Sequence, residues 1–273
     1  MKRRVVITGL GIVSPVGNDI ATAWDNIVNG RSGIGRITRF DPSAFNAHIA
    51  GEVKDFDVTS IMPIKEARTM DTFIHYGIAA GLQAWNDSGL DIAHTDPERV
   101  GVIVGSGIGG LQRIEETQTE YLQRGPRRIS PFFVPASLIN LISGQLTIML
   151  GLKGPSYAVV SACTTGLHSI GDAARMIEYG DADVMVAGGV HGVFQAELAL
   201  VRDMAQPQMR CMGKGKTIKA CSTMAKVSKL ASMTQPVVIS TAPSMDSVIN
   251  QTQAARDKLT EMTNHQVMRR CLK

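Results

Sequence analysis

Residues 157–189 read YAVVSACTTGLHSIGDAARMIEYGDADVMVAGG, and this stretch decides the fold. The apolar, β-branched run at Tyr157–Ser161 predicts a buried strand. Helical spacing of apolar residues follows at Thr164–Tyr179, and Val184–Ala187 predicts a second apolar strand. A strand, a helix and another strand in this order are typical of layered α/β folds.

The same alternation extends to the start of the chain. Its basic first residues are followed by only a short apolar run, which predicts a first strand and not a signal peptide. We therefore expect an α/β protein with further strands at Arg4–Thr8 and Val100–Val104. The expected helices are Ile20–Val28 with Asp19 as its cap, Met70–Ser88, a polar segment ending near Gln123, and Ser137–Leu150.

Cys163 stands where the expected strand at Tyr157–Ser161 meets the following helix. The N-terminus of a helix presents unpaired N–H groups and a partial positive charge, and both favour a thiolate over a thiol. Because the thiolate is the reactive form, this position indicates a candidate nucleophile. A buried structural cysteine explains the residue equally well when it is considered alone.

Six motifs, in order along the chain, resemble those of the β-ketoacyl-acyl carrier protein synthases. The likeness is greatest to the type II elongating enzyme of bacterial fatty acid synthesis, and it covers residues 1–189. The motifs are RVVITGLG at 4–11, GSGIGG at 105–110, ISPFFVP at 129–135, GLKGPS at 151–156, SACTTGLHSIG at 161–171 and GDADVMVAGG at 180–189.

The resemblance implies the N-terminal half of a thiolase-like layered fold and the activity of a 3-oxoacyl-[acyl carrier protein] synthase, an acyltransferase. Cys163 would accept the acyl group as a thioester, and decarboxylation of malonyl-acyl carrier protein would supply the carbanion that attacks it. A covalent intermediate of this kind divides one difficult step into two easier ones. The backbone N–H of Cys163 is the expected oxyanion donor from this half.

The family also implies binding residues and partners. Ile108 and Phe133 match positions near the acyl pocket, although plain core packing explains both without the family. The intact family forms homodimers, and it needs no cofactor or metal of its own because phosphopantetheine arrives on the carrier protein. Four residues match basic positions of the docking surface for acidic acyl carrier protein: Lys65, Arg68, Arg127 and Arg128.

Residues 190–273 differ in composition from residues 1–189. They carry 12 Lys and Arg against 5 Asp and Glu, whereas residues 1–189 carry 16 against 19. We therefore expect a family half at 1–189 and a divergent basic tail of unassigned structure at 190–273. Within that tail, Pro236–Ser240 could form a strand and Ser247–Met262 an amphipathic helix.

The tail also lacks residues that the family mechanism requires. That mechanism needs a lysine and two histidines from the second half, in His-Gly-Thr and Gly-His motifs, and neither motif occurs in residues 190–273. A shifted reading frame or a truncation explains this better than a recombined or fused segment or a divergent domain. We expect impaired elongation and, because a half-fold exposes apolar surface, poor solubility or self-association.

The histidines that are present give no obvious substitute for the missing ones. His168 lies five residues after Cys163, about 140° around a helix, so the two side chains should diverge. We expect a structural role for it. His191 follows the last recognisable strand and has no partner motif.

Other functions have weaker support. Gly105, Gly107 and Gly110 fit a dinucleotide-binding loop loosely, but the confirming acidic residue is missing. A non-catalytic fragment that acts as a dimerisation or binding partner stays possible. The basic tail lacks the aromatic residues of a specific single-strand binder, and no apolar run is long enough to span a membrane. The cysteines show neither zinc nor disulfide spacing, so a reducing cytoplasmic setting is expected.

Overall fold

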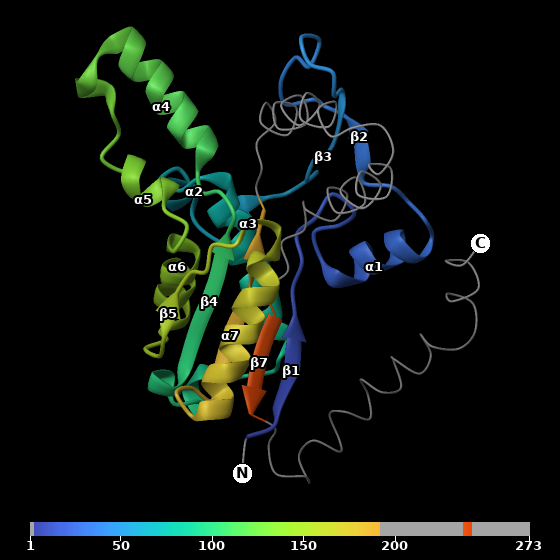
Figure 1. The fold of residues 1–273 in the computed structure, drawn as a ribbon, viewed down its shortest axis with the longest axis vertical. Coiled ribbons are helices and arrows are strands. Elements are labelled where there is room, and N and C mark those ends of the chain that lie inside the picture. The colour runs from blue at the N-terminus through green and yellow to red at the C-terminus, as the bar shows by residue number, and fades with distance from the viewer. Residues whose placement is uncertain (1–2, 192–236, 242–273) are drawn as a thin grey trace, which may run out of the picture.

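The computed structural model describes residues 3–191 and 237–241, and within them the main element is a five-stranded sheet (Figure 1). The strand order is β1-β7-β6-β4-β5. Strand β4 runs parallel to both β5 and β6, whereas β7 is antiparallel to its neighbours β1 and β6. The strands are β1 (Val5–Leu10), β4 (Val100–Ser106), β5 (Ser156–Tyr157), β6 (Val184–Val190) and β7 (Val237–Thr241).

The two central parallel strands are apolar along almost their whole length. Every residue of β4 and of β6 is buried, as expected for parallel strands that are covered on both faces. Their register runs from Val100 opposite Val184 to Ser106 opposite Val190. Since both strands end at the same edge of the sheet, the loops that follow them are brought together there.

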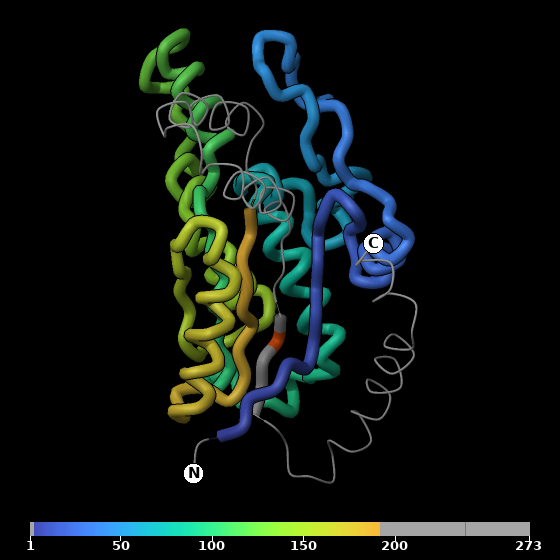
Figure 2. Tube along the Cα trace, turned by 45° about the vertical axis from the view of Figure 1, so that its right-hand side comes forward, coloured from blue at the N-terminus to red at the C-terminus, as the bar shows by residue number. Residues whose placement is uncertain are grey.

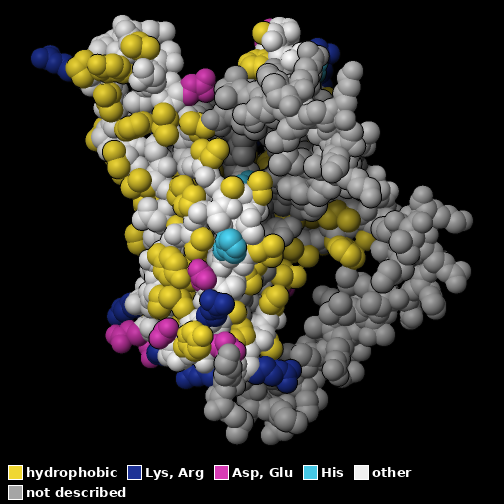
Figure 3. Space-filling view, in the orientation of Figure 1, with side chains coloured by type: hydrophobic (Ala, Val, Ile, Leu, Met, Phe, Trp, Pro, Cys, Tyr) yellow, Lys and Arg dark blue, Asp and Glu magenta, His cyan; other side chains and the backbone are white. Residues whose placement is uncertain are grey.

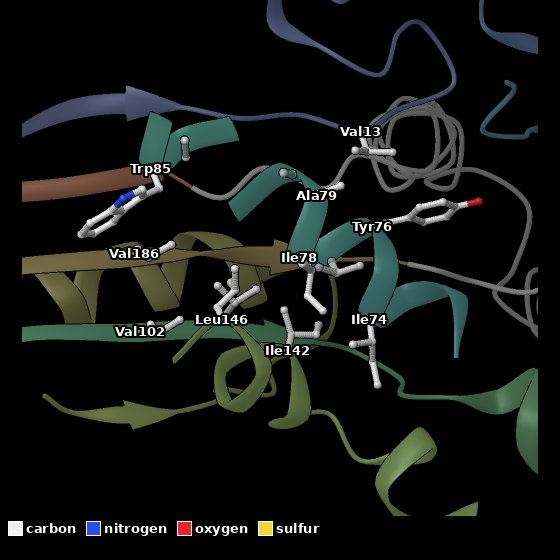
Figure 4. Close-up of a cluster of buried hydrophobic side chains, with 14 of the residues drawn as sticks. Val13, Ile74, Tyr76, Ile78, Ala79, Trp85, Val102, Ile142, Leu146 and Val186 are labelled. Carbon is white, nitrogen blue, oxygen red and sulfur yellow. The ribbon is translucent and has the colours of Figure 1, made fainter. Parts of the chain in front are cut away.

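Helices cover both faces of this sheet. Helices α3 (Thr72–Asp87) and α6 (Leu141–Leu150) pack on one face, and α7 (Thr165–Tyr179) packs on the other (Figure 1). Figure 4 shows α3 residues such as Ile78 pointing toward Val102 and Val186 of the strands and toward Leu146 of α6. A second cluster joins α7 to the opposite strand face through Ile103, Ala173, Ile177, Ala182, Met185 and Ala187.

Two arms project from the end of the sheet at which α7 begins (Figure 2). One contains α4 and α5, and the other contains the antiparallel pair β2–β3. The peripheral elements are α1 (Ile20–Val28), β2 (Ile34–Arg36), β3 (Ile49–Gly51), α2 (Ile64–Ala67), α4 (Leu111–Arg124) and α5 (Phe133–Ser137).

Most of the expected elements are confirmed. The strands at Arg4–Thr8, Val100–Val104 and Val184–Ala187 appear as β1, β4 and β6; β4 and β6 end two and three residues later than expected, and β1 begins one residue later and ends two later. The helices Ile20–Val28, Met70–Ser88 and Thr164–Tyr179 are α1, α3 and α7, and Asp19 caps α1 by accepting from the Thr22 N–H at 2.8 Å. The strand near Pro236–Ser240 is β7; the helix expected at Ser247–Met262 lies outside the described residues.

Two expected elements are wrong in extent. The helix expected at Ser137–Leu150 begins only at Leu141 as α6, because Ser137 ends α5 and Leu138 adopts an extended conformation between the two helices. The strand Tyr157–Ser161 pairs with β4 only at its first residue, and Val160 is 58% exposed instead of buried. Within the described residues, no helix combines the length and hydrophobicity that crossing a membrane requires.

Candidate acyl-transfer site

Three chain segments converge at the edge of the sheet where the parallel strands end. The glycine-rich loop 105–110 follows β4, His191 follows β6, and the segment after β5 leads into a short 3-10 helix, η5 (Ala162–Thr164). A Cβ placed on Gly107 would lie 3.1 Å from Ala162 Cα and 3.2 Å from His191 Cε1. Gly107 therefore lies against both the turn that contains Cys163 and the imidazole of His191.

Cys163 lies in η5, immediately before the 15 residues of α7, and its side chain is exposed. The turn is strained, because Ala162 has a positive φ of 51°, which residues with a Cβ rarely adopt. The buried Thr165 holds this turn in place. Its hydroxyl accepts from the Ser161 N–H at 3.0 Å and donates to the Ala162 carbonyl at 2.7 Å.

The start of α7 gives the cysteine its electrostatic setting. The backbone N–H of Thr164 donates to the Ser161 carbonyl at 3.1 Å, whereas the Cys163 N–H has no partner among the described residues. An unpaired N–H at the N-terminus of a helix is a donor for an anion or an oxyanion. The local geometry therefore suits a nucleophile whose product carries a developing negative oxygen.

The N-terminus of α7 also approaches the sheet closely. A Cβ on Gly189 of β6 would lie 2.7 Å from Gly166 N and 2.8 Å from Gly166 Cα. A Cβ on Gly105 of β4 would lie 2.0 Å from the Val159 carbonyl oxygen. Glycine at these positions lets the turn with Cys163 lie directly on the ends of β4 and β6.

His168 supports the cysteine turn from its exposed side. Its Nδ1 forms a hydrogen bond of 2.7 Å with the Ser161 hydroxyl, two residues before Cys163. This contact agrees with the structural role expected from its position around the helix. The hydrogen bond adds a second link, besides that of Thr165, between α7 and the residues that lead into the turn.

The structure brings Ile108 and the helix of Phe133 to the same end of the sheet as Cys163. The Gly110 N–H donates to the Ser137 carbonyl at 3.2 Å, and a Cβ on Gly109 would lie 2.3 Å from the same oxygen. The glycine-rich loop thus lies between the cysteine turn and α5, which begins at Phe133. Ile108 is 46% exposed, so it is not simply a core residue.

The four basic residues matched to the docking surface are exposed, but they form two separate pairs. Lys65 and Arg68 lie on and directly after α2, whereas Arg127 and Arg128 lie in a 3-10 helix after α4. The start of α4 packs beside α2, so the pairs are separated by about the length of α4, roughly 20 Å for 14 residues.

A cavity of about 220 Å³ lies beside Arg68, between α2 and the starts of α3 and α4. Asp71 caps α3 by accepting from the Phe73 N–H and also accepts from the Arg113 N–H at 3.1 Å. Burial raises the pKa of Asp71 and lowers the pKa of His75, whose Nε2 bonds to the Ala67 carbonyl. Sequence reasoning did not find this group, which joins α2, α3 and α4 behind the basic pair.

His191 also lies at this edge of the sheet, and the sequence indicated no partner for it. Its Nε2 is buried and has no hydrogen-bond partner among the described residues. Burial alone lowers the pKa of His191 below its ordinary value of 6.5. The sequence signal was weak because its neighbours at Gly107 and Ala162 are far from it along the chain.

A cysteine on a strained turn, at the start of a helix that covers a mainly parallel sheet, is the arrangement of a thiolase-like ketosynthase fold. Solved ketosynthase structures share this fold. The chain superposes on the ishigamide ketosynthase/chain length factor with a TM-score of 0.73 at 22% identity, covering 92% of this chain and 61% of that one. A type II polyketide ketosynthase in complex with its acyl-carrier protein gives a TM-score of 0.67 at 21% identity, covering 92% and 65%.

The chain belongs to the β-ketoacyl synthase family: residues 2–225 match the family described as Beta-ketoacyl synthase, N-terminal domain. It is 56% identical over 188 residues to 3-oxoacyl-[acyl-carrier-protein] synthase 2 of Vibrio harveyi, and 53% identical over 188 residues to that of Coxiella burnetii. The match to the Staphylococcus aureus protein is 47% over 187 residues. The aligned part is 69%, 69% and 68% of this chain but only 45% of each relative.

Proposed function

We propose that this chain carries the acyl-accepting half of a 3-oxoacyl-[acyl carrier protein] synthase. One observation carries the proposal: Cys163 is exposed on a strained turn at the start of α7, within the region that matches the curated relatives. The Cys163 thiolate attacks the carbonyl carbon of an acyl thioester. A new C–S bond forms, the C–S bond to the carrier breaks, and the departing carrier thiolate takes up the proton that Cys163 gave up when its thiolate formed.

The geometry supports this first step more than the condensation that follows. The unpaired Cys163 N–H and the partial positive charge of α7 stabilise the oxyanion of the tetrahedral intermediate. The His-Gly-Thr and Gly-His motifs that the family uses for decarboxylation do not occur in residues 190–273. We therefore expect acylation of Cys163 and slow or absent elongation with malonyl-acyl carrier protein.

Acyl carrier protein is the proposed partner, acting in the cytoplasm. One of the structurally similar proteins of known structure is a ketosynthase in complex with an acyl-carrier protein. In this chain, one exposed basic pair lies near the start of α4 and the other lies just after its end, and both can contact an acidic surface. Because the pairs Lys65/Arg68 and Arg127/Arg128 are about one helix length apart, we expect the carrier to contact them at separate points. Loss of either pair should weaken binding mainly at low salt.

Homodimerisation is the second proposed association. Among the described residues, strand β5 is an edge of the sheet, and an edge strand can pair with a strand of a second copy. Hydrophobic side chains follow the flank that carries α5, α6 and β5 in Figure 3. The exposed apolar residues of this flank are Phe132, Val134, Leu138, Ile148, Met149 and Val160. A patch of this kind is typical of protein interfaces.

The dimer is tested by light scattering after size exclusion. Val160→Glu places a charge beside the β5 edge and should give monomers. Ile49→Glu is the matched control, because Ile49 is equally exposed at 61% but lies on β3 in the other arm. If Val160→Glu and the unchanged chain have the same mass, the edge of β5 is not the interface.

Acylation is tested by mixing the full chain with acyl-acyl carrier protein and measuring intact mass. We expect one acyl adduct, abolished by Cys163→Ser and retained when Cys211, Cys221 and Cys271 are all replaced by serine. An adduct that survives Cys163→Ser would refute the assignment of the nucleophile. No adduct on any form would instead favour an inert binding fragment, and an elongated product after malonyl-acyl carrier protein is added would show that no machinery is missing.

A further inference from the structure

Thr165 is the first residue of α7, and its side chain is fully buried. Its methyl group packs against β4, because a Cβ on Gly105 would lie 2.7 Å from Thr165 Cγ2. Its hydroxyl accepts from the Ser161 N–H at 3.0 Å and donates to the Ala162 carbonyl at 2.7 Å. The sheet therefore fixes one side of Thr165, while its other side holds the backbone in front of Cys163.

The bond to the Ala162 carbonyl also sets the direction of the next N–H group. The Ala162 carbonyl and the Cys163 N–H belong to one peptide unit, which is planar and trans, so the C=O and N–H bonds point in opposite directions. The carbonyl oxygen is held on the side of the buried Thr165. The Cys163 N–H is therefore directed to the opposite side, and it has no partner among the described residues.

The conformation that gives this direction is strained. Ala162 has a φ of 51°, and rotation to an ordinary negative φ would turn the peptide unit that follows it and redirect the Cys163 N–H. A positive φ at a residue with a Cβ persists only where neighbouring contacts impose it. The backbone supplies two such contacts, from the Thr165 N–H to the Ala162 carbonyl and from the Thr164 N–H to the Ser161 carbonyl. The Thr165 hydroxyl supplies two more.

We propose that Thr165 is a positioning residue for acyl transfer, which directs the Cys163 N–H at the thioester oxygen as that oxygen becomes an oxyanion. The inference deepens the proposed function and rests on it. As the Cys163 thiolate adds to the carbonyl carbon, an electron pair moves to the oxygen, where a correctly directed N–H stabilises it. The pair then re-forms the C=O bond, the C–S bond to the carrier breaks, and the carrier thiolate takes up the proton that Cys163 released. Thr165 exchanges no proton or electron pair with the substrate and acts only through the Cys163 peptide unit.

The hydroxyl and the methyl group of Thr165 can be removed separately. Thr165→Val removes both hydroxyl hydrogen bonds, while the backbone bond to the Ala162 carbonyl remains. Thr165→Ser keeps the hydroxyl and removes the methyl that packs on Gly105. Thr147→Val is the matched control in α6, because the Thr147 hydroxyl also makes two contacts, with a carbonyl of its own helix at 2.7 Å and with the Ser156 hydroxyl at 3.0 Å.

Two reactions of Cys163 in the full chain, each followed by peptide mass, separate the direction of its N–H from access to its sulfur. Acylation by acyl-pantetheine passes through an oxyanion, whereas alkylation by iodoacetamide displaces iodide without forming one. At high pH, where the thiol is a thiolate, alkylation reports access alone. We expect Thr165→Val to lower the maximal acylation rate about 10-fold to 100-fold, less than complete loss of an oxyanion donor would, because its N–H is misdirected and not removed. Its alkylation rate and its half-saturating acyl-pantetheine concentration should not change, since the N–H acts only in the transition state.

The other variants distinguish positioning from stability. Thr165→Ser and Thr147→Val should acylate at the parent's rate although both melt at lower temperature. Slow acylation of either one, equal losses of acylation and alkylation in Thr165→Val, or an unchanged acylation rate in Thr165→Val overturns the proposal. If Thr165→Val does not fold, Thr165→Ser decides alone: the parent's acylation rate at a lower melting temperature supports the role of the hydroxyl, and slow acylation overturns it.

The parent chain separates this inference from the function on which it rests. An unacylated parent would overturn the proposed function together with the role of Thr165. A parent that is acylated at Cys163, with Thr165→Val acylated equally fast, would overturn the positioning role and leave the proposed function standing.

Discussion

The contact between Gly166 of α7 and Gly189 of β6 makes a graded prediction about the position of the Cys163 turn. In Gly189→Ala, the new Cβ would lie 2.7 Å and 2.8 Å from the backbone N and Cα of Gly166. Carbon atoms prefer separations of about 3.5–4.0 Å, so α7 must move by about 1 Å. Because backbone atoms cannot rotate away, we expect the upper end of the usual overpacking penalty, about 3 kcal/mol.

Alanine substitutions at two glycines of α7 provide the comparison for Gly189→Ala. A Cβ on Gly166 would lie 3.3 Å from Gly189 N, which is tight but not impossible, so Gly166→Ala should destabilise less. Gly171 has no atom within 4 Å of its Cβ position. Alanine at that site gains helix propensity, and Gly171→Ala should stabilise the chain by about 0.5–1 kcal/mol.

Thermal unfolding followed by circular dichroism measures this series. At about 2–4 °C per kcal/mol for a chain of this size, Gly189→Ala should melt roughly 6–12 °C lower and Gly171→Ala a few degrees higher. Acylation at Cys163 should fall by about 100-fold in Gly189→Ala, since a shift of this size misplaces the nucleophile. A melting temperature of Gly189→Ala within about 1 °C of the parent would show that α7 does not lie on β6 as described.

Two other perturbations test how the sheet is held together. Ser143 of α6 accepts from the Val104 N–H at 2.9 Å and contacts the Tyr157 carbonyl at 2.8 Å, so Ser143→Ala should cost about 1–3 kcal/mol in the same melts because it leaves buried groups unpaired. An unchanged melting temperature would contradict that bridge between β4 and β5. The hydrogen bond from Arg99 lowers the pKa of Asp183 below 3.8, so its stabilisation is present above that pH and is lost as the pH falls through the folded value. Asp183→Asn should therefore lower the melting temperature near pH 6 but much less near pH 2, and an equal loss at both values would refute the ion pair as its cause.

Local signals were sufficient for the central elements. The cap Asp19 is a short acidic residue directly before an apolar helical repeat, and it accepts from the backbone as such residues usually do, whereas the cap of α3, Asp71, lies inside the helix expected at Met70–Ser88. The buried strands β4 and β6 are continuous apolar runs, which their position between helix layers requires. The alternation of these elements was enough to predict an α/β fold before any resemblance was considered.

The start of the helix expected at Ser137–Leu150 was wrong for a reason that lies outside the segment. Apolar residues recur along it, and no glycine or proline lies between Ser137 and Leu141 to mark the break at Leu138. The Ser137 carbonyl accepts instead from the Gly110 N–H, in a loop 27 residues earlier. A contact with a distant loop thus accompanies the end of α5, and a periodicity argument cannot detect it.

The strand expected at Tyr157–Ser161 shows the same limit. Its valines favour a pleated strand, but pairing stops at Tyr157. Beyond it, the Val159 carbonyl lies against Gly105, only 2.0 Å from where a Cβ would be, and the chain turns toward Cys163. Strand propensity reports how well a side chain fits a sheet, and it carries no information about where the backbone leaves that sheet.

The candidate site divides along the same line between local and distant information. The position of Cys163 before a helix is a local feature, and it indicated a candidate nucleophile. The nearness of His191 depends on the parallel register of β4 and β6, which places residues 107 and 191 at one edge although 84 positions separate them. His168 is closer to Cys163 along the chain, but helical geometry predicts that its side chain diverges from the cysteine, and it contacts the Ser161 hydroxyl instead.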